Sequence, residues 1–435
     1  MPDTSNSLTV PPNDSVTTAN ATTNANANAN AQPDRNKAVS WHILGVLSAL
    51  MGFASISTDF YLPAMPAMED AFGAGHGSIE FTITSYLIGF CVGQLFWGPI
   101  SDRYGRRLPI ALGLGLFVIG ASGCAMSDSI YEIIFWRVVQ ALGASAGVVL
   151  GRAMVRDLYE GPKAAQMMST LLAVMTAAPL LGPIIGAQVA AMSSWRGIFW
   201  VLVAVAILTL AALTTIPETL PDSARRSESF GRTLQRYGQI VVQPPILAYL
   251  GLGSFFYAGM FAHVSGTPFA YIDYYGVPSE YYGLLFGAGI IGIMGSNLLN
   301  SRLVMKSSVD RLLGFGTLGA MISGLLVSLA SLTDWGGLWG LAVPVFLFVS
   351  CTGFIVGNSI AGALADVPQE AGAVSALVGS LQYGGGIAGS ALVGVFADGT
   401  PSAMGMIIAL SGAGSLLCYS LLVSSGRRQA AREAC

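Results

Sequence analysis

Long uncharged apolar stretches dominate the sequence and constrain its fold more than any motif does. Hydrophobic residues make up 53% of the 435 residues and charged residues only 10%, whereas soluble domains carry about a quarter charged residues. So few charges cannot cover a surface that faces water. A helix that spans a bilayer needs about 20 mainly apolar residues, and the chain has enough of them for about twelve helices.

Twelve apolar segments separated by short polar ones are the predicted spans, which makes the fold class all-α integral membrane. Their boundaries, each good to about three residues, are 41–62, 79–100, 108–127, 130–151, 165–190, 197–216, 246–271, 282–302, 311–332, 337–362, 371–396 and 402–424. The 54 glycines agree with this class, because small residues let helices in lipid approach closely.

The positions of Lys and Arg test the count of spans. Short cytoplasmic segments retain basic residues, and 18 of the 20 Lys and Arg residues fall on the side that the count assigns to the cytoplasm. Arg196 falls on the opposite side, and Arg137 lies inside a span. A miscounted helix would scatter this pattern. The sequence therefore predicts a multi-pass membrane protein with both termini cytoplasmic.

The longest internal loop, 217–245, divides the chain into two sets of six spans. It holds four prolines and four basic residues, which favours a domain boundary there. A six-plus-six layout is typical of transporters that rock two bundles about a site at the midplane. The predicted organisation is a disordered polar tail, a six-helix bundle, a cytoplasmic linker, a second six-helix bundle and a cytoplasmic tail, over 1–38, 39–216, 217–245, 246–424 and 425–435.

Composition and motifs argue against several other classes of protein. The net charge is −3 and no basic patch is interleaved with aromatic residues, so a nucleic-acid partner is not predicted. The five cysteines lack the spacing of a metal site. The chain has three histidines and neither an H-E-x-x-H nor a G-x-S-x-G motif, so the catalytic residues of an intramembrane enzyme are missing. The sequence also has no G-x-x-x-x-G-K-[ST] loop, which an ATP-driven pump would need. We expect no enzyme activity, metal or cofactor.

The loop after the second span carries the first motif, Gly98-Pro-Ile-Ser-Asp-Arg-Tyr-Gly-Arg-Arg107. Gly98 permits close helix contact, Gly105 permits a tight turn, and Asp102 can meet a helix N-terminus or an arginine. The segment resembles the G-x-x-x-D-R-x-G-R-R loop of the major facilitator superfamily, which latches the two halves on the cytoplasmic side. The resemblance assigns a gating role to Gly98, Asp102, Arg103, Gly105, Arg106 and Arg107, with Asp157 as candidate partner. As an alternative, the arginines serve only as topology anchors.

The fourth span contains a charge, Arg137, within an apolar run. Such a charge costs at least about 2.5 kcal/mol, so it requires a partner or a water-filled cavity. With Gln140 it resembles the superfamily motif R-x-x-Q-G, whose arginine is tied to proton coupling, although Ala141 replaces the glycine. Glycines at 143, 147 and 151 give the helix a smooth face. The alternative for Arg137 is that it snorkels to the near end of the span.

The fifth span contains Pro179, Gly182, Pro183 and Gly186. Each proline deletes a backbone hydrogen bond and kinks the helix, while the glycines open its packing face. The segment resembles the G-P-x-x-G motif of the superfamily's antiporters, with Ala187 in place of the final glycine. This resemblance implies export by exchange.

The first span, 41–62, carries Asp59 near its end, just before Pro63. Together with the segments R-D-L-Y at 156–159 and P-E-T-L at 217–220, the chain from about residue 40 is similar to the Bcr/CflA branch of drug:proton antiporters, named for bicyclomycin resistance. The resemblance implies proton-coupled efflux, by alternating-access antiport, of small amphipathic drugs such as bicyclomycin, chloramphenicol-like or sulfonamide-like compounds. An exporter of an endogenous metabolite, such as an amino acid or sugar, is the alternative.

The mechanistic hypothesis is that Asp59 binds the coupling ion H⁺. Arg137 holds the Asp59 carboxylate ionised, or releases it, as the cavity switches sides. Burial would favour the neutral carboxyl and Arg137 the ionised one, so that drug and proton compete for one site. Alternatively, Asp59 marks the end of the helix, because the prolines that follow already break it there.

Ten aromatic or polar residues on six spans are candidates for the lining of a substrate cavity. They are Tyr86, Phe90, Gln140, Phe256, Tyr257, Met260, His263, Asn297, Asn358 and Gln382. Each is also a common helix-packing residue. His263 is a candidate second protonation site, with a buried neutral histidine as the alternative. The expected partners are a small-molecule drug, protons and the lipid bilayer, and we expect a monomer.

Overall fold

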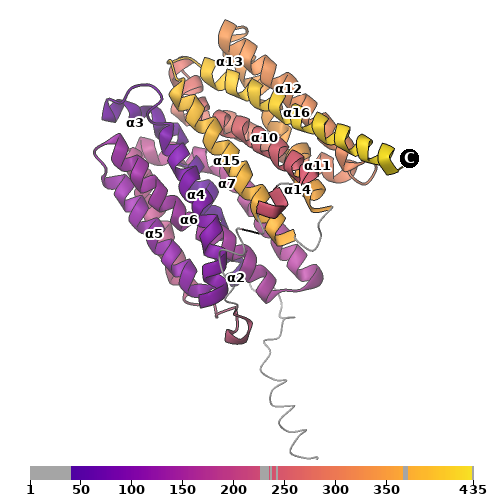
Figure 1. Cartoon of the computed structure of the whole chain (residues 1–435). Coiled ribbons are helices and arrows are strands. Elements are labelled where there is room, and N and C mark those ends of the chain that lie inside the picture. The colour runs from indigo at the N-terminus through magenta and orange to yellow at the C-terminus, as the bar shows by residue number, and fades with distance from the viewer. Residues whose placement is uncertain (1–40, 226–234, 236–237, 242, 366–370, 434–435) are drawn as a thin grey trace, which may run out of the picture.

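The computed structural model describes residues 41–225, 235, 238–241, 243–365 and 371–433, and within these ranges it consists of helices and turns (Figure 1). The predicted tail 1–38 lies outside the described residues, as do parts of the predicted linker 217–245 and the last two residues of the predicted tail 425–435.

The first six predicted spans are all helical. They correspond to α2 (Trp41–Asp59), α4 (Phe81–Tyr104), α5 (Arg107–Met126), α6 (Ile130–Leu158), α7 (Gly161–Met192) and α8 (Trp195–Leu213). The first span is bent, because the chain turns through η1 (Leu62–Ala64) into the short helix α3 (Met65–Phe72). Pro63 and Pro66 lie at this bend, where each fixes φ and removes an N–H donor. After α8 the chain makes one 3₁₀ turn, η2 (Asp222–Ala224).

The last six predicted spans are also helical. They correspond to α10 (Pro244–Pro268) with its π-helical extension η3 (Phe269–Tyr274), α11 (Ser279–Leu303), α12 (Val309–Thr333), α13 (Gly337–Ser350) followed by α14 (Thr352–Ala365), α15 (Ala371–Val395) and α16 (Ser402–Glu433). The predicted span 337–362 corresponds to one span, Gly337–Leu364, whose helix is interrupted at Cys351. Within the described residues, ten helices are long and apolar enough to cross a membrane, or eleven with the bent first span.

The same packing pattern occurs in both sets of six helices. In the first set α2 packs against α6, α7 and α8, and α5 packs against α6 and α8. In the second set α10 packs against α14, α15 and α16, and α12 packs against α14 and α16. We call these sets the N-terminal half and the C-terminal half. Their equivalent packing indicates two copies of one six-helix arrangement.

The two ends of the bundle differ in charge, and we name them accordingly. The basic face carries Arg103, Arg106 and Arg107 at the junction of α4 with α5, and the opposite face carries the turn between α5 and α6. The halves meet where α4 packs against α15 and where α7 packs against α11. Figure 1 shows that α16 carries the C-terminus away from α2, so the helices diverge toward the basic face.

Glycines set the distance between helices at several of these contacts. On α6, Gly143 lies against α5, whereas Gly147 and Gly151 lie against α2. A Cβ on Gly147 would collide with the carbonyl oxygen of Leu50. The glycine face predicted for α6 therefore packs against two helices, α5 and α2. Between α4 and α6, a Cβ on Gly89 would collide with the carbonyl oxygen of Val138.

We predict that Gly89→Ala destabilises the protein by about 1–3 kcal/mol, because overpacking forces two helix backbones apart. Gly115→Ala is the matched control, since nothing lies within 4 Å of the Cβ it would add. Thermal unfolding in detergent should show a lower Tm for the first variant and an equal or slightly higher Tm for the second. Equal Tm values for both variants would contradict the close approach of α4 and α6.

Candidate functional site

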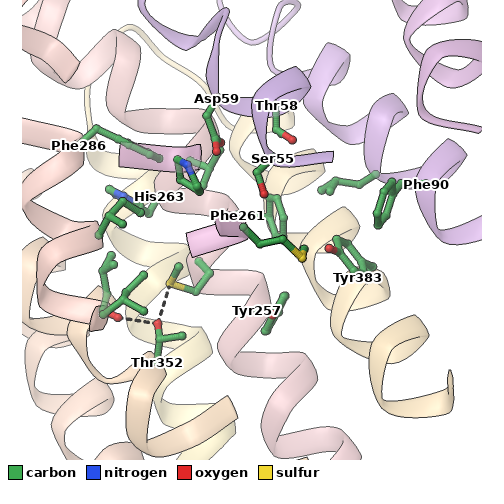
Figure 2. A pocket seen from close by; sticks show the side chains of 18 of the residues that line it. Ser55, Thr58, Asp59, Phe90, Tyr257, Phe261, His263, Phe286, Thr352 and Tyr383 are labelled. Atoms are coloured by element: carbon green, nitrogen blue, oxygen red, sulfur yellow. Dashed lines mark hydrogen bonds between the residues drawn. The ribbon is translucent and has the colours of Figure 1, made fainter. Parts of the chain in front are cut away.

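A cavity of about 250 Å³ lies between the two halves near the middle of the bundle (Figure 2). Its walls come from α2, α4, α6 and α7 of the N-terminal half and from α10, α11, α13, α14 and α15 of the C-terminal half. Most of the lining is aromatic, methionine or aliphatic, and a few polar groups such as Ser55, Thr58 and Thr352 are set among them. Large adaptable side chains with few polar anchors are typical of sites that accept amphipathic small molecules.

Five of the ten predicted cavity residues line this cavity. They are Tyr86, Phe90, Tyr257, Met260 and His263. The His263 ring stacks on Phe286, with 5.5 Å between ring centroids and 6° between the planes. Figure 2 places these two rings and Asp59 on one side of the cavity, with Phe90 and Tyr383 on the other.

The other five predicted residues do not line the cavity, and packing explains each case. Phe256 stacks on Phe348, Gln140 binds Arg137, Asn358 donates to Asn300 at 2.8 Å, Gln382 packs beside Gly253, and Asn297 is exposed on α11. Residue type alone does not fix the direction of a side chain on a helix. One residue along, the direction turns by about 100°, so Tyr257 and Tyr383 face the cavity while their neighbours do not.

Several lining residues were missed by the sequence analysis. Phe261, Phe286 and Tyr383 supply aromatic surface from the C-terminal half, and Met175 joins the predicted Pro179 on α7. Tyr383 lies 5.0 Å from Phe90 between ring centroids, so it links the two halves across the cavity. Helical spacing could have identified Phe261, since it lies four residues after the predicted Tyr257 and therefore shares its helix face.

Asp59 is the one acidic residue among the described residues that line the cavity. It lies at the last position of α2 and is 7% exposed. The antiporter-motif glycines hold α7 against it: the Cβ position of Gly182 is 3.3 Å from Asp59 Cβ, and a Cβ on Gly186 would collide with the carbonyl oxygen of Phe60. Pro179 lines the cavity and Pro183 is buried one turn further along. The motif therefore sets the position of the carboxylate.

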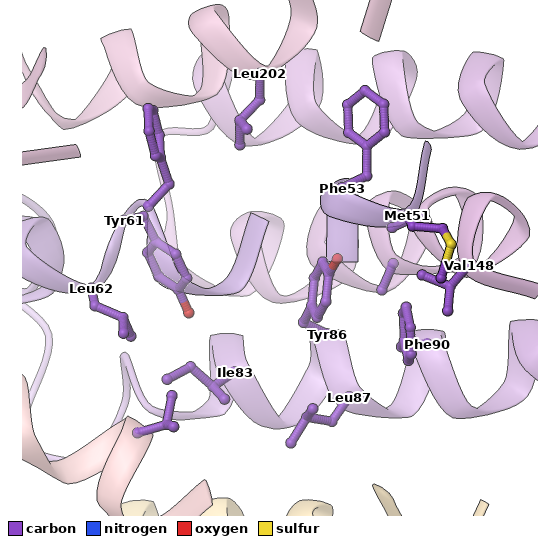
Figure 3. Packing of buried hydrophobic residues seen from close by; sticks show 14 of the residues in the cluster. Met51, Phe53, Tyr61, Leu62, Ile83, Tyr86, Leu87, Phe90, Val148 and Leu202 are labelled. Carbon is purple, nitrogen blue, oxygen red and sulfur yellow. The ribbon is translucent and has the colours of Figure 1, made fainter. Parts of the chain in front are cut away.

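Arg137 is completely buried in the N-terminal half, at 0% exposure, which excludes the snorkelling alternative. Its Nη1 donates to the carbonyl oxygen of Ser57 at 3.0 Å and to Gln140 Oε1 at 2.8 Å. The guanidinium Cζ lies 4.3 Å from the ring centroid of Tyr61 and 4.2 Å from that of Tyr86. Figure 3 shows these two rings within the apolar core. Carbonyls and aromatic faces thus hold the charge.

Arg137 and Asp59 are neighbours without a direct ion pair among the described salt bridges. Arg137 binds the backbone of Ser57, two residues before Asp59, and covers Tyr86, which lines the cavity. Its Nη2 is buried and makes no hydrogen bond within the described structure. The Nη2 donors therefore have no acceptor among the described residues in this conformation.

The predicted gating loop forms a charged network at the basic face. Arg106 donates through Nη1 to Asp102 Oδ1 at 2.6 Å and through Nε to Asp157 Oδ2 at 2.8 Å. Asp157 also accepts from Thr219 Oγ1 at 3.2 Å. Gly105 has φ of +88° and makes the tight turn between α4 and α5. These partners all belong to the N-terminal half, so in this conformation the network joins α4, α5 and α6 to the chain that follows α8.

Three other residues of the predicted loop differ in what they contact. Arg107 donates to the carbonyl oxygen of Thr214 at 3.2 Å, and Arg103 lies 5.4 Å from the ring centroid of Tyr104. The close helix contact predicted for Gly98 is wrong, because nothing lies within 4 Å of its Cβ position. The neighbouring Trp97 faces α6 instead and donates to the carbonyl oxygen of Leu142 at 2.7 Å.

Glu218 is a functional candidate that the sequence analysis quoted in P-E-T-L without giving it a role. Its carboxylate accepts the N–H groups of Arg106, Arg107, Thr219 and Leu220 at 2.8–3.1 Å. The first two are the unpaired N–H donors at the start of α5, where a negative charge is favourable. Partial burial raises the pKa of Glu218, but the four hydrogen bonds together lower it by more. The pKa of Glu218 therefore lies below its usual value.

We predict that Glu218→Gln weakens the network and lowers Tm at pH 7. Because the pKa in the folded protein lies below the ordinary 4.5, the stabilisation by Glu218 is fully present above about pH 4.5 and is lost as pH falls through the lowered pKa. The difference in Tm between wild type and Glu218→Gln, measured in detergent from pH 7 to pH 3, should therefore shrink only at the acid end. Glu280→Gln, at an exposed position on the opposite face, is the matched control. A difference that does not change with pH would refute the role of the ionised carboxylate.

Comparison with known proteins agrees with the fold and the motifs. A family model described as the Major Facilitator Superfamily matches residues 47–390. The chain is 32% identical over 382 residues to the bicyclomycin resistance protein homolog of Haemophilus influenzae, covering 88% of this chain and 95% of the relative. It is 31% identical to the chloramphenicol resistance protein of Pseudomonas aeruginosa, covering 76% and 78%, and 28% identical to multidrug resistance protein D of Escherichia coli, covering 87% and 95%.

Solved structures extend the likeness to three dimensions. The xylose transporter XylE from E. coli, in a partially occluded inward open conformation, matches with a TM-score of 0.68 over 88% of this chain and 97% of that chain. The sequence identity is 16%, so this match supports the fold alone. The twelve-helix prediction is confirmed, and the chain is a multi-pass membrane transporter. It belongs to the Major Facilitator Superfamily, in the branch of the bicyclomycin resistance proteins.

Proposed function

We propose that this protein exports small amphipathic drugs across a bacterial inner membrane in exchange for protons. The observation that carries the proposal is the central cavity, which is lined by aromatic and methionine side chains from both halves and contains one carboxylate, that of Asp59, within its described lining. Relatives named for resistance to bicyclomycin, to chloramphenicol and to multiple drugs support this class of cargo.

The apolar lining suits the cargo of a drug exporter better than that of a sugar carrier. A sugar needs a dense set of hydrogen-bond partners, since its hydroxyl groups lose water on binding. Here Tyr257, Phe261, Phe286 and Met260 offer flat or flexible apolar surface, and the polar groups are few. Such a lining binds planar or amphipathic molecules of varied shape. This favours drugs over an endogenous sugar or amino acid.

The coupling mechanism that we propose uses Asp59 and Arg137 together. Asp59 carries the proton, and the nearby buried charge of Arg137 stabilises the ionised carboxylate when the proton leaves. Because Asp59 lies in the cavity wall, a bound drug displaces the proton or shields the carboxylate from it. Proton and drug then occupy the site in turn, which is what exchange requires. His263, stacked on Phe286 across from Tyr383, is the further candidate for protonation.

The proposed orientation places the basic face in the cytoplasm, in keeping with the positive-inside rule. The helices meet at the opposite face and diverge toward the basic face, as an inward-facing state requires. The Arg106 network is then a gate component on the cytoplasmic side, which engages the C-terminal half when the cavity faces outward. Asp157 and Glu218 hold it in position until then.

Drug resistance of cells that express the protein tests the cargo. Expression in a host that lacks its own efflux pumps should raise the minimal inhibitory concentration of chloramphenicol, bicyclomycin or a sulfonamide. Tyr383→Ala and Phe286→Ala should change the relative resistance to these compounds, because each removes an aromatic wall of the cavity. Phe135→Ala, at a lipid-facing position that is 59% exposed, is the control. Export of labelled amino acids or sugars with no resistance to any drug would favour the metabolite alternative.

Transport into membrane vesicles tests the coupling to protons. Asp59→Asn should reduce chloramphenicol uptake into everted membrane vesicles with an acidic lumen to the level of vesicles that lack the protein, because the amide cannot carry a proton. Asp128→Asn, whose side chain is 92% exposed, should transport like wild type. Full gradient-driven uptake by Asp59→Asn would remove that residue from the coupling step. Uptake that survives a protonophore in the wild type would exclude antiport.

A further inference from the structure

A second cavity lies at the opposite face, where residues of both halves close over the central one. It is lined from the N-terminal half by Glu69, His76, Gly77 and Glu80, and from the C-terminal half by residues of α10, η3, α15, α16 and the connection between the last two. Its volume is about 50 Å³. It is separate from the central cavity, and none of the described residues lines both.

The two halves touch most closely beside this cavity, in a contact that we call the seam. Gly77 has φ of +88°, and a Cβ there would collide with the carbonyl oxygen of Gly394. Thr84 Oγ1 donates to Ser390 Oγ at 3.0 Å, and Ser390 Oγ donates to the carbonyl oxygen of Glu80 at 3.5 Å. The seam therefore consists of Gly77, Glu80 and Thr84 against Ser390 and Gly394, and it must separate when the opposite face opens.

Glu80 is buried by this closure. Its side chain lines the cavity, the residue is 3% exposed, and Oε2 makes no hydrogen bond within the described structure. Glu69 is 8% exposed and also has a buried Oε2 without a partner, while its Oε1 lies 3.1 Å from His76 Nδ1. The Glu69 carboxylate thus has one partner in His76, and the Glu80 carboxylate has the N–H of its own residue. An ionised carboxylate that loses water and gains so few partners is strongly disfavoured.

The surrounding charges do not supply a counter-charge to Glu80 among the described salt bridges. Asp70 on α3 and Asp273 on η3 are acidic, and the Asp398 carboxylate accepts from Thr400 and Ser402 at the start of α16. His76 is the one basic side chain among the described lining residues, and α10, α15 and α16 contribute uncharged residues such as Gly266, Val393 and Met404. No group of three potential metal ligands occurs within the described residues. A proton is thus the ligand that this geometry suits.

We propose that Glu80, with Glu69 beside it, is a proton-binding site at the seam, and that loading it with protons closes the opposite face of the transporter. In the open state water hydrates both carboxylates, and they ionise. In the closed state the seam excludes water, so closure takes up a proton at Glu80. By linkage, acid outside favours closure, and alkaline conditions favour opening.

This site differs from Asp59 in place and in role. Asp59 meets the cargo in the central cavity, whereas Glu80 lies at the seam between α4 and α15 and lines a cavity too small for a drug. The inference concerns the resting protein without cargo. It therefore stands or falls independently of the proposed drug export and of the coupling role of Asp59.

The test measures opening of the opposite face against pH without any drug. Spin labels go at Tyr131 and Trp335, which are 80% and 63% exposed at the opposite-face ends of the two halves, in a variant whose native cysteines are replaced. Double electron–electron resonance in nanodiscs then gives the fractions of protein with short and long distances between the two labels, from pH 5 to pH 9. The Asp59→Asn background removes any contribution from that residue.

We expect the long-distance fraction to rise with pH in both wild type and Asp59→Asn, with a slope of up to about tenfold in the open:closed ratio per pH unit for one proton. Glu80→Gln, a mimic of the protonated form, should keep the short distance at every pH. Glu69→Gln should shift the midpoint. Ser390→Ala, which weakens the seam but retains both acids, should favour opening and keep the slope. The exposed Glu280→Gln should match wild type.

Three outcomes would overturn the proposal. They are a distance distribution that does not change with pH in wild type, a Glu80→Gln variant that keeps the wild-type pH profile, and loss of the profile in Asp59→Asn alone. Size-exclusion profiles and Tm of each variant establish that it is folded. Because a glutamine at position 80 relieves the cost of burying a charge, Glu80→Gln should be at least as stable as wild type.

Discussion

A single buried cation organises the N-terminal half of this transporter. Arg137 has no contact with solvent, and its charge is balanced by a backbone carbonyl, an amide oxygen and two tyrosine rings. To satisfy it, the end of α2 and the starts of α4 and α6 must come together at one point. That convergence fixes where α2 stops, and therefore where Asp59 enters the central cavity. Removing the charge would affect three helices at once, because Arg137 on α6 donates to the carbonyl oxygens of Ser57 on α2 and Thr82 on α4.

The two halves have equivalent helix packing but unequal chemistry. The N-terminal half holds the buried Arg137, Asp59 and the Arg106 network, whereas the C-terminal half contributes mainly aromatic surface and His263. An interface in which one half carries the charges and the other presents apolar walls can slide without breaking many ion pairs. Glycines at the α7–α11 and α4–α15 contacts reduce the side-chain interlocking further. Such a division suits rigid-body rocking, in which the charged half changes its hydration while the apolar half changes its angle.

The sequence alone predicted the helices well and the cavity in part, for a physical reason. Spans are long, and apolar length with the placement of basic residues fixes their number, so the main departure of the structure from the predicted spans is the bend near Pro63. The direction of a side chain depends on helix rotation, which packing decides and composition does not. This is why Tyr257 was identified correctly and its neighbour Phe256 was not. Glu80 fell at the edge of the predicted span 79–100, where an acid is typical of a helix start, and only burial at the seam distinguishes it.

The bent segment after α2 connects the two acidic sites mechanically. Asp59 ends α2 at the central cavity, and η1 and α3 then lead over the opposite face to Glu69 and on to Glu80 at the start of α4. η1 packs against α10 and α11, and α3 packs against η3, so this segment lies against the C-terminal half on the side where the halves close. Motion of the segment therefore changes the hydration of Glu80 and the position of Asp59 together. Because Gly186 of α7 lies against the backbone of Phe60, the same motion is transmitted to the proline-containing helix that lines the cargo cavity. A proton bound at the seam thus acts on the cavity through a continuous chain of packed backbone.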